Sequence, residues 1–453
     1  MISKYFSRAW VFALSLLLLS SCLNTSDENL VYSPDAQIYA LSLSSASDTA
    51  GLLSATKFTI DQINGKIFNK EPLPYQFQVD SVLLNIQGAD LYSPFTLVQL
   101  HLYPDSTIFW IQTDSVAIDR LYGITTTAAD GITSKYYDFA LNIYQEDPYK
   151  LTWEHIKSDY LPTPVESQQT IAFQNRFITY FKSGSTIQAM SSAASDGTAW
   201  STANLSGMPP TLYIPSLLAT HDAAFGLDMT TGTVYKSTDG VNWSPVITPY
   251  PVRAIYGELP LATKGDILAA VEINDTLTFA ETNDFTVVNP LKMNPFKKLP
   301  AGFPVKDFSA TKVDASTSYS IKYLIVSGGT DEDNMPNNEI WILQEKEGEI
   351  AHILSRKPDS VSVNGSSLFY YDDKPYMMMA SSGKNRLIYS ENFGLDWITA
   401  AENQSFPAEF SQRIHASVIT DAANYIWIFG GISDTQTQLA DVWRSRLNKF
   451  AAN

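Results

Sequence analysis

The sequence predicts an all-β protein in which a β-sandwich is followed by a six-bladed β-propeller. Two observations predict this fold class. From about residue 36 to 148, short runs alternate apolar and polar residues between turn residues, and a period of two is the pattern of half-buried strands. From residue 149 to the end, strand-and-turn motifs recur about every 50 residues, which is typical of propeller blades.

The composition is that of a folded protein without a nucleic-acid partner. The chain has 453 residues, of which 45% are hydrophobic and 17% charged, so it can bury a sizeable core. Its net charge of −17 has the wrong sign for neutralising phosphate groups. We therefore expect its polypeptide to bind neither nucleic acid nor an anionic membrane surface.

Residues 1–21 have the layout of an export signal. Lys4 and Arg8 precede an apolar run from Ala9 to Leu19, which is short for a membrane span. Leu19-Ser20-Ser21-Cys22 resembles the bacterial lipobox, in which the cysteine is lipidated and becomes the first mature residue. The alternative is an ordinary secretory signal followed by a chance cysteine. Because Cys22 is the only cysteine, the chain forms neither an intramolecular disulfide nor a cysteine-based zinc site.

An acylated Cys22 would anchor the protein in a lipid bilayer, since each buried methylene contributes about 0.8 kcal/mol. Residues 22–35 form a polar tether, whose Asp27 and Glu28 resemble the acidic signals that direct lipoproteins of the Bacteroides group to the outer surface. We therefore predict an outer-membrane lipoprotein facing the periplasm or the cell surface, with the surface favoured.

Residues 36–148 predict an immunoglobulin-like (Ig-like) sandwich. About seven or eight alternating runs within roughly 110 residues are typical of this fold. No stretch in this region shows a helical period. The clearest runs cover residues 38–43, 57–60, 81–86, 96–103, 107–111 and 136–144.

Two copies of one motif mark blades of the propeller. Gly328-Gly329 ends an apolar run and precedes Trp341, and Gly430-Gly431 precedes Trp443 with the same spacing. Paired glycines allow a sharp turn at a strand end where side chains would collide. This pattern, with Arg413 and His415 before the second copy, resembles the kelch blade.

A second motif marks other blades. Residues 235–243 and 389–397 resemble the Asp-box hairpin of sialidase-like propellers, with weaker copies at 194–200 and 279–285. In the clear copies a carboxylate or amide caps the turn, glycine supplies a positive φ, and a tryptophan opens the outer strand. Together the motifs predict a six-bladed kelch/sialidase-like β-propeller in residues 149–453.

The repeats align on one anchor per blade, in the strand before the turn. These anchors are Ser192, Tyr235, Phe279, Trp341, Tyr389 and Trp443. The longest interval, from Phe279 to Trp341, contains Pro290, Pro295, Pro300 and Pro304 and predicts a loop inserted between blades three and four. Little chain follows Trp443, so residues 149–156 are predicted to close the ring by pairing with its strand.

The order of lipobox, sandwich and mixed propeller, with the segments SPDAQIYALSLS and KFTIDQINGKIFN, resembles the Bacteroidetes lipoproteins grouped as DUF6242. The resemblance covers nearly the whole mature chain. That family is of unknown function, so the resemblance implies a fold and a location but no catalytic residues.

The sequence contains no catalytic, metal-binding or cofactor-binding constellation. Its five histidines are scattered without metal-ligand spacing. No Ser-His-Asp arrangement or Gly-rich phosphate loop is present. The resemblance to sialidases implies an arginine triad and a Tyr–Glu pair, but no arginine stands in that family's Phe-Arg-Ile-Pro context.

A ligand site is predicted on the face formed by loops within the Gly-pair blades and between blades. The candidate ligand-binding residues are Tyr250, Arg253, Tyr256, Arg386, Arg413 and His415. Aromatic rings beside arginines suit a glycan or a peptide ligand. The alternative for each residue is ordinary packing between blades.

These observations predict a lipid-anchored envelope protein that acts as a non-enzymatic binding platform for a glycan or protein ligand, with the sandwich as a spacer. One alternative is a glycan-active enzyme, either a sialidase-like hydrolase or a lyase. Another is a structural subunit of an outer-membrane complex, which a large exposed apolar patch would indicate.

Overall fold

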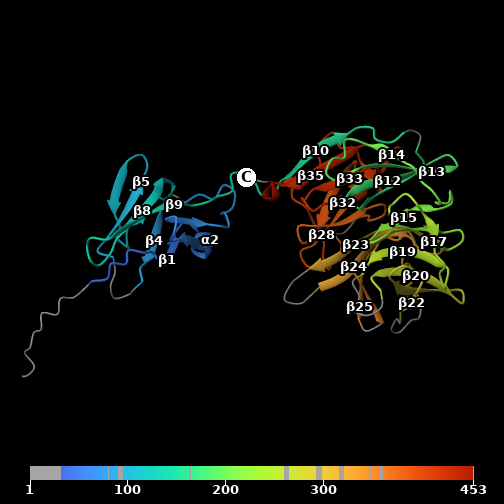
Figure 1. Ribbon diagram of the computed structural model, residues 1–453, viewed down its shortest axis with the longest axis horizontal. Coiled ribbons are helices and arrows are strands. Elements are labelled where there is room, and N and C mark those ends of the chain that lie inside the picture. Colours follow the sequence, from blue (N-terminus) through green and yellow to red (C-terminus); the bar gives the residue numbers. More distant parts are fainter. Residues whose placement is uncertain are drawn as a thin grey trace, which may run out of the picture. The chain divides into compact units, whose positions relative to one another are not determined.

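The computed structural model describes residues 32–79, 81–89, 95–162, 165–259, 265–291, 298–315, 321–346, 349–357 and 361–451. The predicted signal peptide, the predicted lipidation site Cys22 and most of the predicted tether lie outside these residues. The chain divides into two compact units, Met1–Asp147 and Pro148–Asn453 (Figure 1).

The first unit is built from two sheets that enclose one hydrophobic core. One sheet has the strand order β1-β4-β7 and the other β2-β3-β9-β8-β5-β6. All neighbouring strands are antiparallel except β3 and β9, which are parallel. The strands are β1 (Ala40–Ser44), β2 (Phe58–Asp61), β3 (Lys66–Asn69), β4 (Val82–Gln87), β5 (Leu97–Leu102), β6 (Ser106–Phe109), β7 (Ser115–Val116), β8 (Leu121–Thr127) and β9 (Ser134–Ala140).

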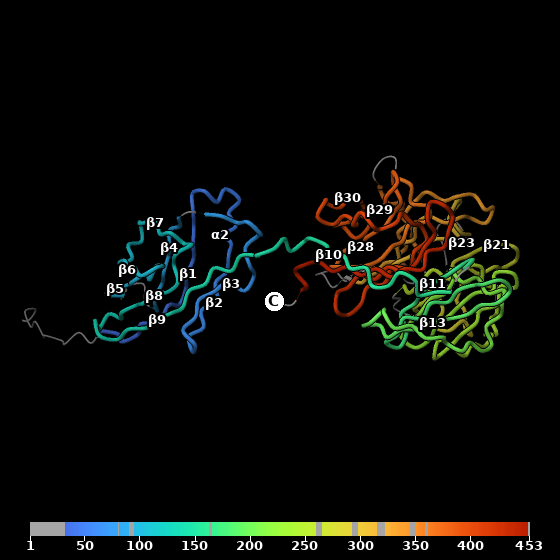
Figure 2. Tube along the Cα trace, turned by 90° about the horizontal axis from the view of Figure 1, so that it is seen from above, coloured from blue at the N-terminus to red at the C-terminus, as the bar shows by residue number. Residues whose placement is uncertain are grey.

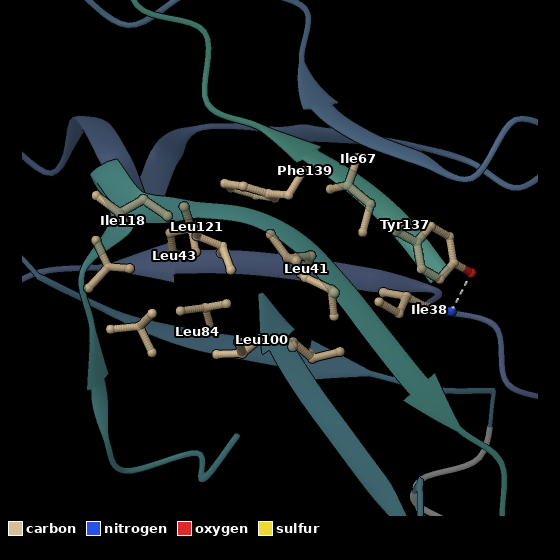
Figure 3. Packing of buried hydrophobic residues seen from close by; sticks show 14 of the residues in the cluster. Ile38, Leu41, Leu43, Ile67, Leu84, Leu100, Ile118, Leu121, Tyr137 and Phe139 are labelled. Atoms are coloured by element: carbon tan, nitrogen blue, oxygen red, sulfur yellow. Dashed lines mark hydrogen bonds between the residues drawn. The ribbon is translucent and has the colours of Figure 1, made fainter. Parts of the chain in front are cut away.

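Alternating residues of these strands form the core. Leu41 and Leu43 of β1 face Leu84 of β4 and Leu100 of β5, and all four are buried (Figure 3). The ring of Tyr137 is fully buried among them, and its hydroxyl accepts a hydrogen bond of 3.0 Å from the backbone nitrogen of Ile38. A buried phenol is tolerated when its oxygen has such a partner.

The first unit departs from the sequence prediction at one element. Residues Leu52–Ala55 form one helical turn, α2, although no helical period is present. Asp48 explains the turn, because its carboxylate accepts hydrogen bonds from the backbone nitrogens of Leu52 and Leu53 at 3.1 and 2.7 Å. Strands β3, β7 and β8 lie outside the clearest alternating runs of the sequence.

The described part of the second unit contains six four-stranded antiparallel sheets and one two-stranded ribbon. The sheets are β11-β12-β13-β14, β15-β16-β17-β18, β19-β20-β21-β22, β23-β24-β25-β26, β27-β28-β29-β30 and β32-β33-β35-β10; the ribbon is β31-β34. The strand bounds are β10 (Leu151–Lys157), β11 (Ser167–Phe173), β12 (Arg176–Ser183), β13 (Thr186–Ala193), β14 (Ser201–Ala203), β15 (Tyr213–Ala219), β16 (Ala224–Asp228), β17 (Thr233–Ser237), β18 (Ser244–Pro245), β19 (Val252–Glu258), β20 (Ile267–Ile273), β21 (Thr276–Thr282), β22 (Asn289–Pro290), β23 (Lys306–Ala315), β24 (Ile321–Thr330), β25 (Ile340–Lys346), β26 (Glu349–Leu354), β27 (Ser367–Tyr371), β28 (Lys374–Ser381), β29 (Lys384–Tyr389), β30 (Ile398–Thr399), β31 (Arg413–Ile414), β32 (Ser417–Thr420), β33 (Ile426–Phe429), β34 (Ile432–Ser433) and β35 (Val442–Leu447). Short 3₁₀ turns cover Ile118–Arg120, Glu402–Gln404 and Asn448–Phe450.

The first strands of the six sheets form an inner ring. β11, β15, β19, β23, β27 and β32 contact one another in this order, and β32 contacts β11 again. Each predicted anchor lies on the third strand of its own sheet, namely β13, β17, β21, β25, β29 and β35. The proline-containing insertion lies between β22 and β23, and its Pro295 is outside the described residues.

Strand β10 completes the last sheet from the other end of the unit, and the predicted pairing of residues 149–156 with the strand of Trp443 is confirmed. β10 runs antiparallel to β35, with His155 opposite Trp443. The two rings stack with centroids 4.5 Å apart. The teal β10 lies beside the red β35 in Figure 1, although nearly the whole unit separates them in sequence. The green β11 follows β10 along the chain in Figure 2.

The capped turns predicted before the outer strands are present. One oxygen of the Asp239 carboxylate accepts hydrogen bonds from the backbone nitrogens of Val241 and Asn242 at 2.9 and 2.8 Å, and these contacts lower the pKa of Asp239. In the corresponding turn after β29, the amide oxygen of Asn392 accepts from the backbone nitrogen of Asp396 at 2.8 Å. The Asp239 carboxylate and the Asn392 amide thus both cap the turn that precedes an outer strand.

Strand direction decides which turns share a face of the second unit. First and third strands of an antiparallel sheet run the same way, so turns between second and third strands lie at the end where the inner strands begin. The Gly-pair turns are at this end, and the capped turns after the third strands are at the opposite end. The first of these ends contains the main cavity.

Candidate functional site

A cavity of about 510 Å³ lies where the six inner strands begin. Every inner strand contributes to its wall, including Ser167 and Gln169 of β11, Tyr213 of β15, Ile255 of β19, Lys306 of β23, Leu368 of β27 and Val418 of β32. The lining is rich in serine and glutamine and includes charged groups. This mixture suits a polar ligand.

Serine hydroxyls fix three successive junctions of the wall. The Ser309 hydroxyl accepts a hydrogen bond from the Leu368 backbone nitrogen at 2.8 Å, which joins β23 to β27. The Ser367 hydroxyl donates to the carbonyl of Ala416, just before β32, at 2.7 Å. The Ser417 hydroxyl accepts from the Thr170 nitrogen at 2.9 Å and joins β32 to β11. These bonds hold the wall in one geometry before any ligand binds.

Two residues before each of these serines, the backbone is left-handed. The φ angles are 56° at Asp307, 69° at Gly365 and 53° at His415. Aspartate and histidine tolerate this conformation better than most residues, but it still disfavours them relative to glycine. Such local strain is found disproportionately at functional sites. In this protein the left-handed backbone at Asp307 and His415 directs a carboxylate and an imidazole to the same cavity.

Gly365 is packed closely beside His415. A Cβ atom at Gly365 would lie 2.7 Å from the Cβ of Ile414 and 3.2 Å from the Nε2 of His415. The backbone nitrogen of His415 donates a hydrogen bond of 2.8 Å to the Gly365 carbonyl, so a side chain at Gly365 would disturb the segment that carries His415.

Asp307 is held from the other side by Tyr213. The Tyr213 hydroxyl donates a hydrogen bond to the Asp307 carboxylate and accepts one of 3.1 Å from the Asp307 backbone nitrogen. Burial and the neighbouring carboxylate raise the pKa of Tyr213 far above its ordinary value. The phenol therefore stays protonated and fixes the carboxylate in the cavity wall.

His415 is neutral at neutral pH. Burial lowers the pKa of its imidazole, and the nearby Asp307 carboxylate offsets this effect only in part. Within the described residues its ring makes no hydrogen bond, so one nitrogen can donate to a ligand and the other can accept from it.

Gln168 and Gln169 line the cavity next to each other but have different roles. The Gln168 amide donates to the carbonyl of Leu439 at 2.6 Å and to the side chain of Gln438 at 2.9 Å. Gly430 has to be glycine, since a Cβ there would lie 2.3 Å from the Gln168 amide oxygen. Gln169 is half-buried, and its side chain makes no hydrogen bond to another described residue.

The structure brings two of the six sequence-predicted residues to this cavity, His415 and Tyr256. Tyr256 is 3% exposed, and its hydroxyl donates to the carbonyl of Pro304 at 3.0 Å. Burial raises the pKa of Tyr256 well above its ordinary value. Its ring packs in the core between β19 and β23 and offers little surface to a ligand.

Tyr250 and Arg253 lie outside the main cavity. Tyr250 is partly buried against the core shared by β16, β17, β20 and β21. Arg253 forms an ion pair with Glu272 and borders a narrow neighbouring pocket, which also contains Tyr213 and Asp307. Arg253 therefore does not line the main cavity, but it shares the neighbouring pocket with two residues that do, Tyr213 and Asp307.

Arg413 and Arg386 have opposite environments. The guanidinium of Arg413 is fully buried and contacts both Asp441 carboxylate oxygens, at 2.6 and 2.9 Å. It also donates to the carbonyls of Gly430 and Ser411, each at 3.0 Å. These contacts leave little for a ligand. Arg386 is exposed on β29 and does not line the cavity.

Lys306, Asp307, Tyr213 and Gln169 are cavity residues that the sequence analysis missed. Asp307 and His415 each lie two residues before a serine that links neighbouring inner strands, Ser309 and Ser417. This shared offset is the sequence signal that relates Asp307 to His415. The longer hairpin of β23 and β24 changes the spacing from Asp307 to the Gly pair, so the two segments do not align on the glycines.

Within the described residues, no group of three or more His, Cys, Asp or Glu side chains is arranged to hold a metal ion. In the same part of the chain, no helix has the length and hydropathy needed to cross a membrane.

The fold and the cavity define the second unit as a β-propeller domain with a polar central pocket. The chain belongs to the DUF6242 family. Its residues 147–453 match the DUF6242 beta propeller domain, and residues 34–141 match the N-terminal domain, which is described as a domain of unknown function. No curated protein matches the chain.

Several solved structures resemble the chain at low identity. The structure of YjhT is 10% identical with a TM-score of 0.39, covering 63% of this chain and 96% of that one. Virginiamycin B lyase from Staphylococcus aureus is 11% identical with a TM-score of 0.38, covering 66% and 100%. A protein of unknown function from Bacteroides thetaiotaomicron is also 11% identical with a TM-score of 0.38, covering 83% and 96%. At such TM-scores the similarity says nothing about function.

Proposed function

We propose that this chain is a lipid-anchored cell-envelope protein whose propeller binds a saccharide in the central cavity without chemically changing it. The observation that carries the proposal is the cavity itself, a space of about 510 Å³ to which all six inner strands contribute polar or backbone groups. Its volume falls within the range of about 300–1,000 Å³ that is usual for small-molecule sites.

The chemistry of the wall favours a ligand rich in hydroxyl groups. The hydroxyls of Ser309, Ser367 and Ser417 already have partners, so the groups free to meet a ligand include the side chains of Lys306, His415 and Gln169 and one oxygen of Asp307. Together these groups include hydrogen-bond donors and hydrogen-bond acceptors, and a sugar hydroxyl needs both. The rigid wall lowers the entropy that binding would otherwise cost.

The proposal assigns a role to each part of the chain. The six sheets with their inner ring support a six-bladed propeller, in which the Gly-pair blades are of the kelch type and the capped turns are Asp boxes. The two-sheet first unit serves as an Ig-like spacer, and the acylated Cys22 holds the protein in the outer membrane with its binding face accessible at the cell surface.

Binding is favoured over sialidase-like hydrolysis because of the arginines. Within the described residues no arginine lines the main cavity, and Arg413 and Arg253 are paired with Asp441 and Glu272. The triad that would hold a sialic acid carboxylate is therefore not assembled there.

The test is to incubate residues 23–453 with an array of host and dietary glycans and to record both bound and released sugars. We expect retention of a saccharide without release. A Gln169→Trp variant, which fills the cavity without removing a hydrogen bond seen in the structure, should lose the retention and keep its melting temperature. Released products would indicate an enzyme. If no glycan of the array is bound or released, this result would contradict saccharide binding and favour a protein partner.

A further inference from the structure

We propose that the saccharide is acidic, a hexuronate or sialate whose carboxylate binds the ammonium group of Lys306. The inference deepens the proposed function and rests on it, because it assigns the chemical class of ligand to the same cavity. It follows from the charges that line the wall and from the partners that each charge already has.

Lys306 is the only cationic side chain lining the cavity within the described residues, because the neighbouring His415 is neutral. Lys306 is half-buried at the start of β23. Its ammonium lies 5.7 Å from the centre of the Tyr213 ring. In the same part of the chain no carboxylate lies within 4.0 Å of it.

The nearest chain neighbour, Asp307, does not neutralise Lys306. The left-handed backbone at Asp307 turns its carboxylate to Tyr213, whose hydroxyl donates to it. Because no carboxylate of the described residues contacts the Lys306 ammonium, an ionised ligand can pair with it without displacing an existing ion pair. Lys306 can therefore bind one anionic group of a ligand.

The remainder of the cavity is complementary to hydroxyl groups. His415 and Asp307 both line the cavity, and one oxygen of the Asp307 carboxylate makes no hydrogen bond to another described residue, so it can accept one from a ligand. Gln169 adds an amide from β11. Lys306 thus supplies one anion-binding point, while Asp307, His415 and Gln169 supply acceptors and donors for hydroxyl groups, as a carboxylated sugar requires. A polyanion would be repelled by the carboxylates of Asp307 and the exposed Glu166.

Calorimetric titration with matched saccharides tests this assignment. The panel comprises oligosaccharides of galacturonate, glucuronate and N-acetylneuraminate, each beside its neutral counterpart. The methyl ester of each acid is the closest control, since it keeps the shape and removes the charge. We expect at least one acid to bind roughly tenfold or more tightly than its ester, because charge-assisted hydrogen bonds are about twice as strong as neutral ones.

Two variants assign the preference to Lys306. Lys306→Met keeps a stem over the Tyr213 ring and should abolish the preference for the acid over the ester, whereas Lys306→Arg should keep it. If Lys306→Met does not fold, the acid and ester titrations of the wild type decide alone. Equal affinity for acids, esters and neutral sugars would overturn this inference and leave the proposed function intact. No binding of any saccharide would overturn both.

Discussion

At the scale of single residues, Gly365 is packed too closely against Ile414 and His415 to carry a side chain without strain. Gly365→Ala adds a Cβ 2.7 Å from that of Ile414 at a φ of 69°, so it combines steric overlap with backbone strain. We expect a loss of roughly 2–4 kcal/mol in the free energy of unfolding. Chemical denaturation measures this loss.

Gly184 provides the matched control for that substitution. Its φ is 61°, but an added Cβ would meet no atom within 4 Å. Gly184→Ala should therefore cost about 1 kcal/mol, from backbone strain alone. Equal losses for the two variants would show that the surroundings of Gly365 are not closely packed.

Arg413 illustrates how a residue predicted to bind ligand serves stability. Arg413→Met removes a fully buried guanidinium and leaves the Asp441 carboxylate without its cation. We expect a loss of roughly 3–5 kcal/mol. The exposed Arg386→Met should stay within about 0.5 kcal/mol of the wild type. Thermal or urea unfolding of the two variants compares them, and a small loss for Arg413→Met would contradict its structural role.

His415 predicts a dependence of stability on pH. Burial lowers its pKa in the folded state below the ordinary value of 6.5, so the unfolded chain binds more protons at mildly acidic pH. The contribution of His415 is therefore fully present above about pH 6.5 and is lost as the pH falls through the folded-state pKa. His415→Gln should reduce the loss of stability between pH 7 and pH 5. A folded-state pKa at or above 6.5, measured by NMR, would exclude this explanation.

At the scale of elements, β10 connects the two ends of the propeller. Deleting residues 149–157 exposes the edge of β35 and removes the stack of His155 on Trp443. We expect the cooperative unfolding transition of the second unit to disappear, as followed by near-ultraviolet circular dichroism.

Glu154→Gln is the control for this deletion. It removes only the ion pair of β10 with Arg444 and should cost less than about 1 kcal/mol. An unchanged melting temperature after the deletion would mean that β10 does not hold the ring together.

The sequence predicted elements best where local chemistry is repeated. The six anchors all fall on third strands, because each third strand is next to a local turn motif, either a Gly pair before it or a capped turn after it. α2 was missed because one carboxylate, Asp48, decides it and only Leu53 is buried. β8 is not among the clearest alternating runs, because its three successive threonines are polar although Thr126 is fully buried.

At the scale of the whole molecule, the site was harder to predict than the fold. His415 could be proposed from its place before a Gly pair, but Tyr213 and Asp307 are 94 residues apart in sequence and meet only because the inner strands form a ring. The sequence also does not distinguish a buried arginine from one that faces a ligand. Arg413 and Arg386 differ in burial, which is set by tertiary packing.

The most direct test of the central claim is a crystal structure of the protein with the saccharide that the glycan array selects. Our account predicts ligand density in the central cavity, in contact with residues of β11, β23 and the segment before β32, and with its charged group at Lys306. A saccharide bound to the outer strands or to the first unit, with the cavity filled only by water, would contradict it.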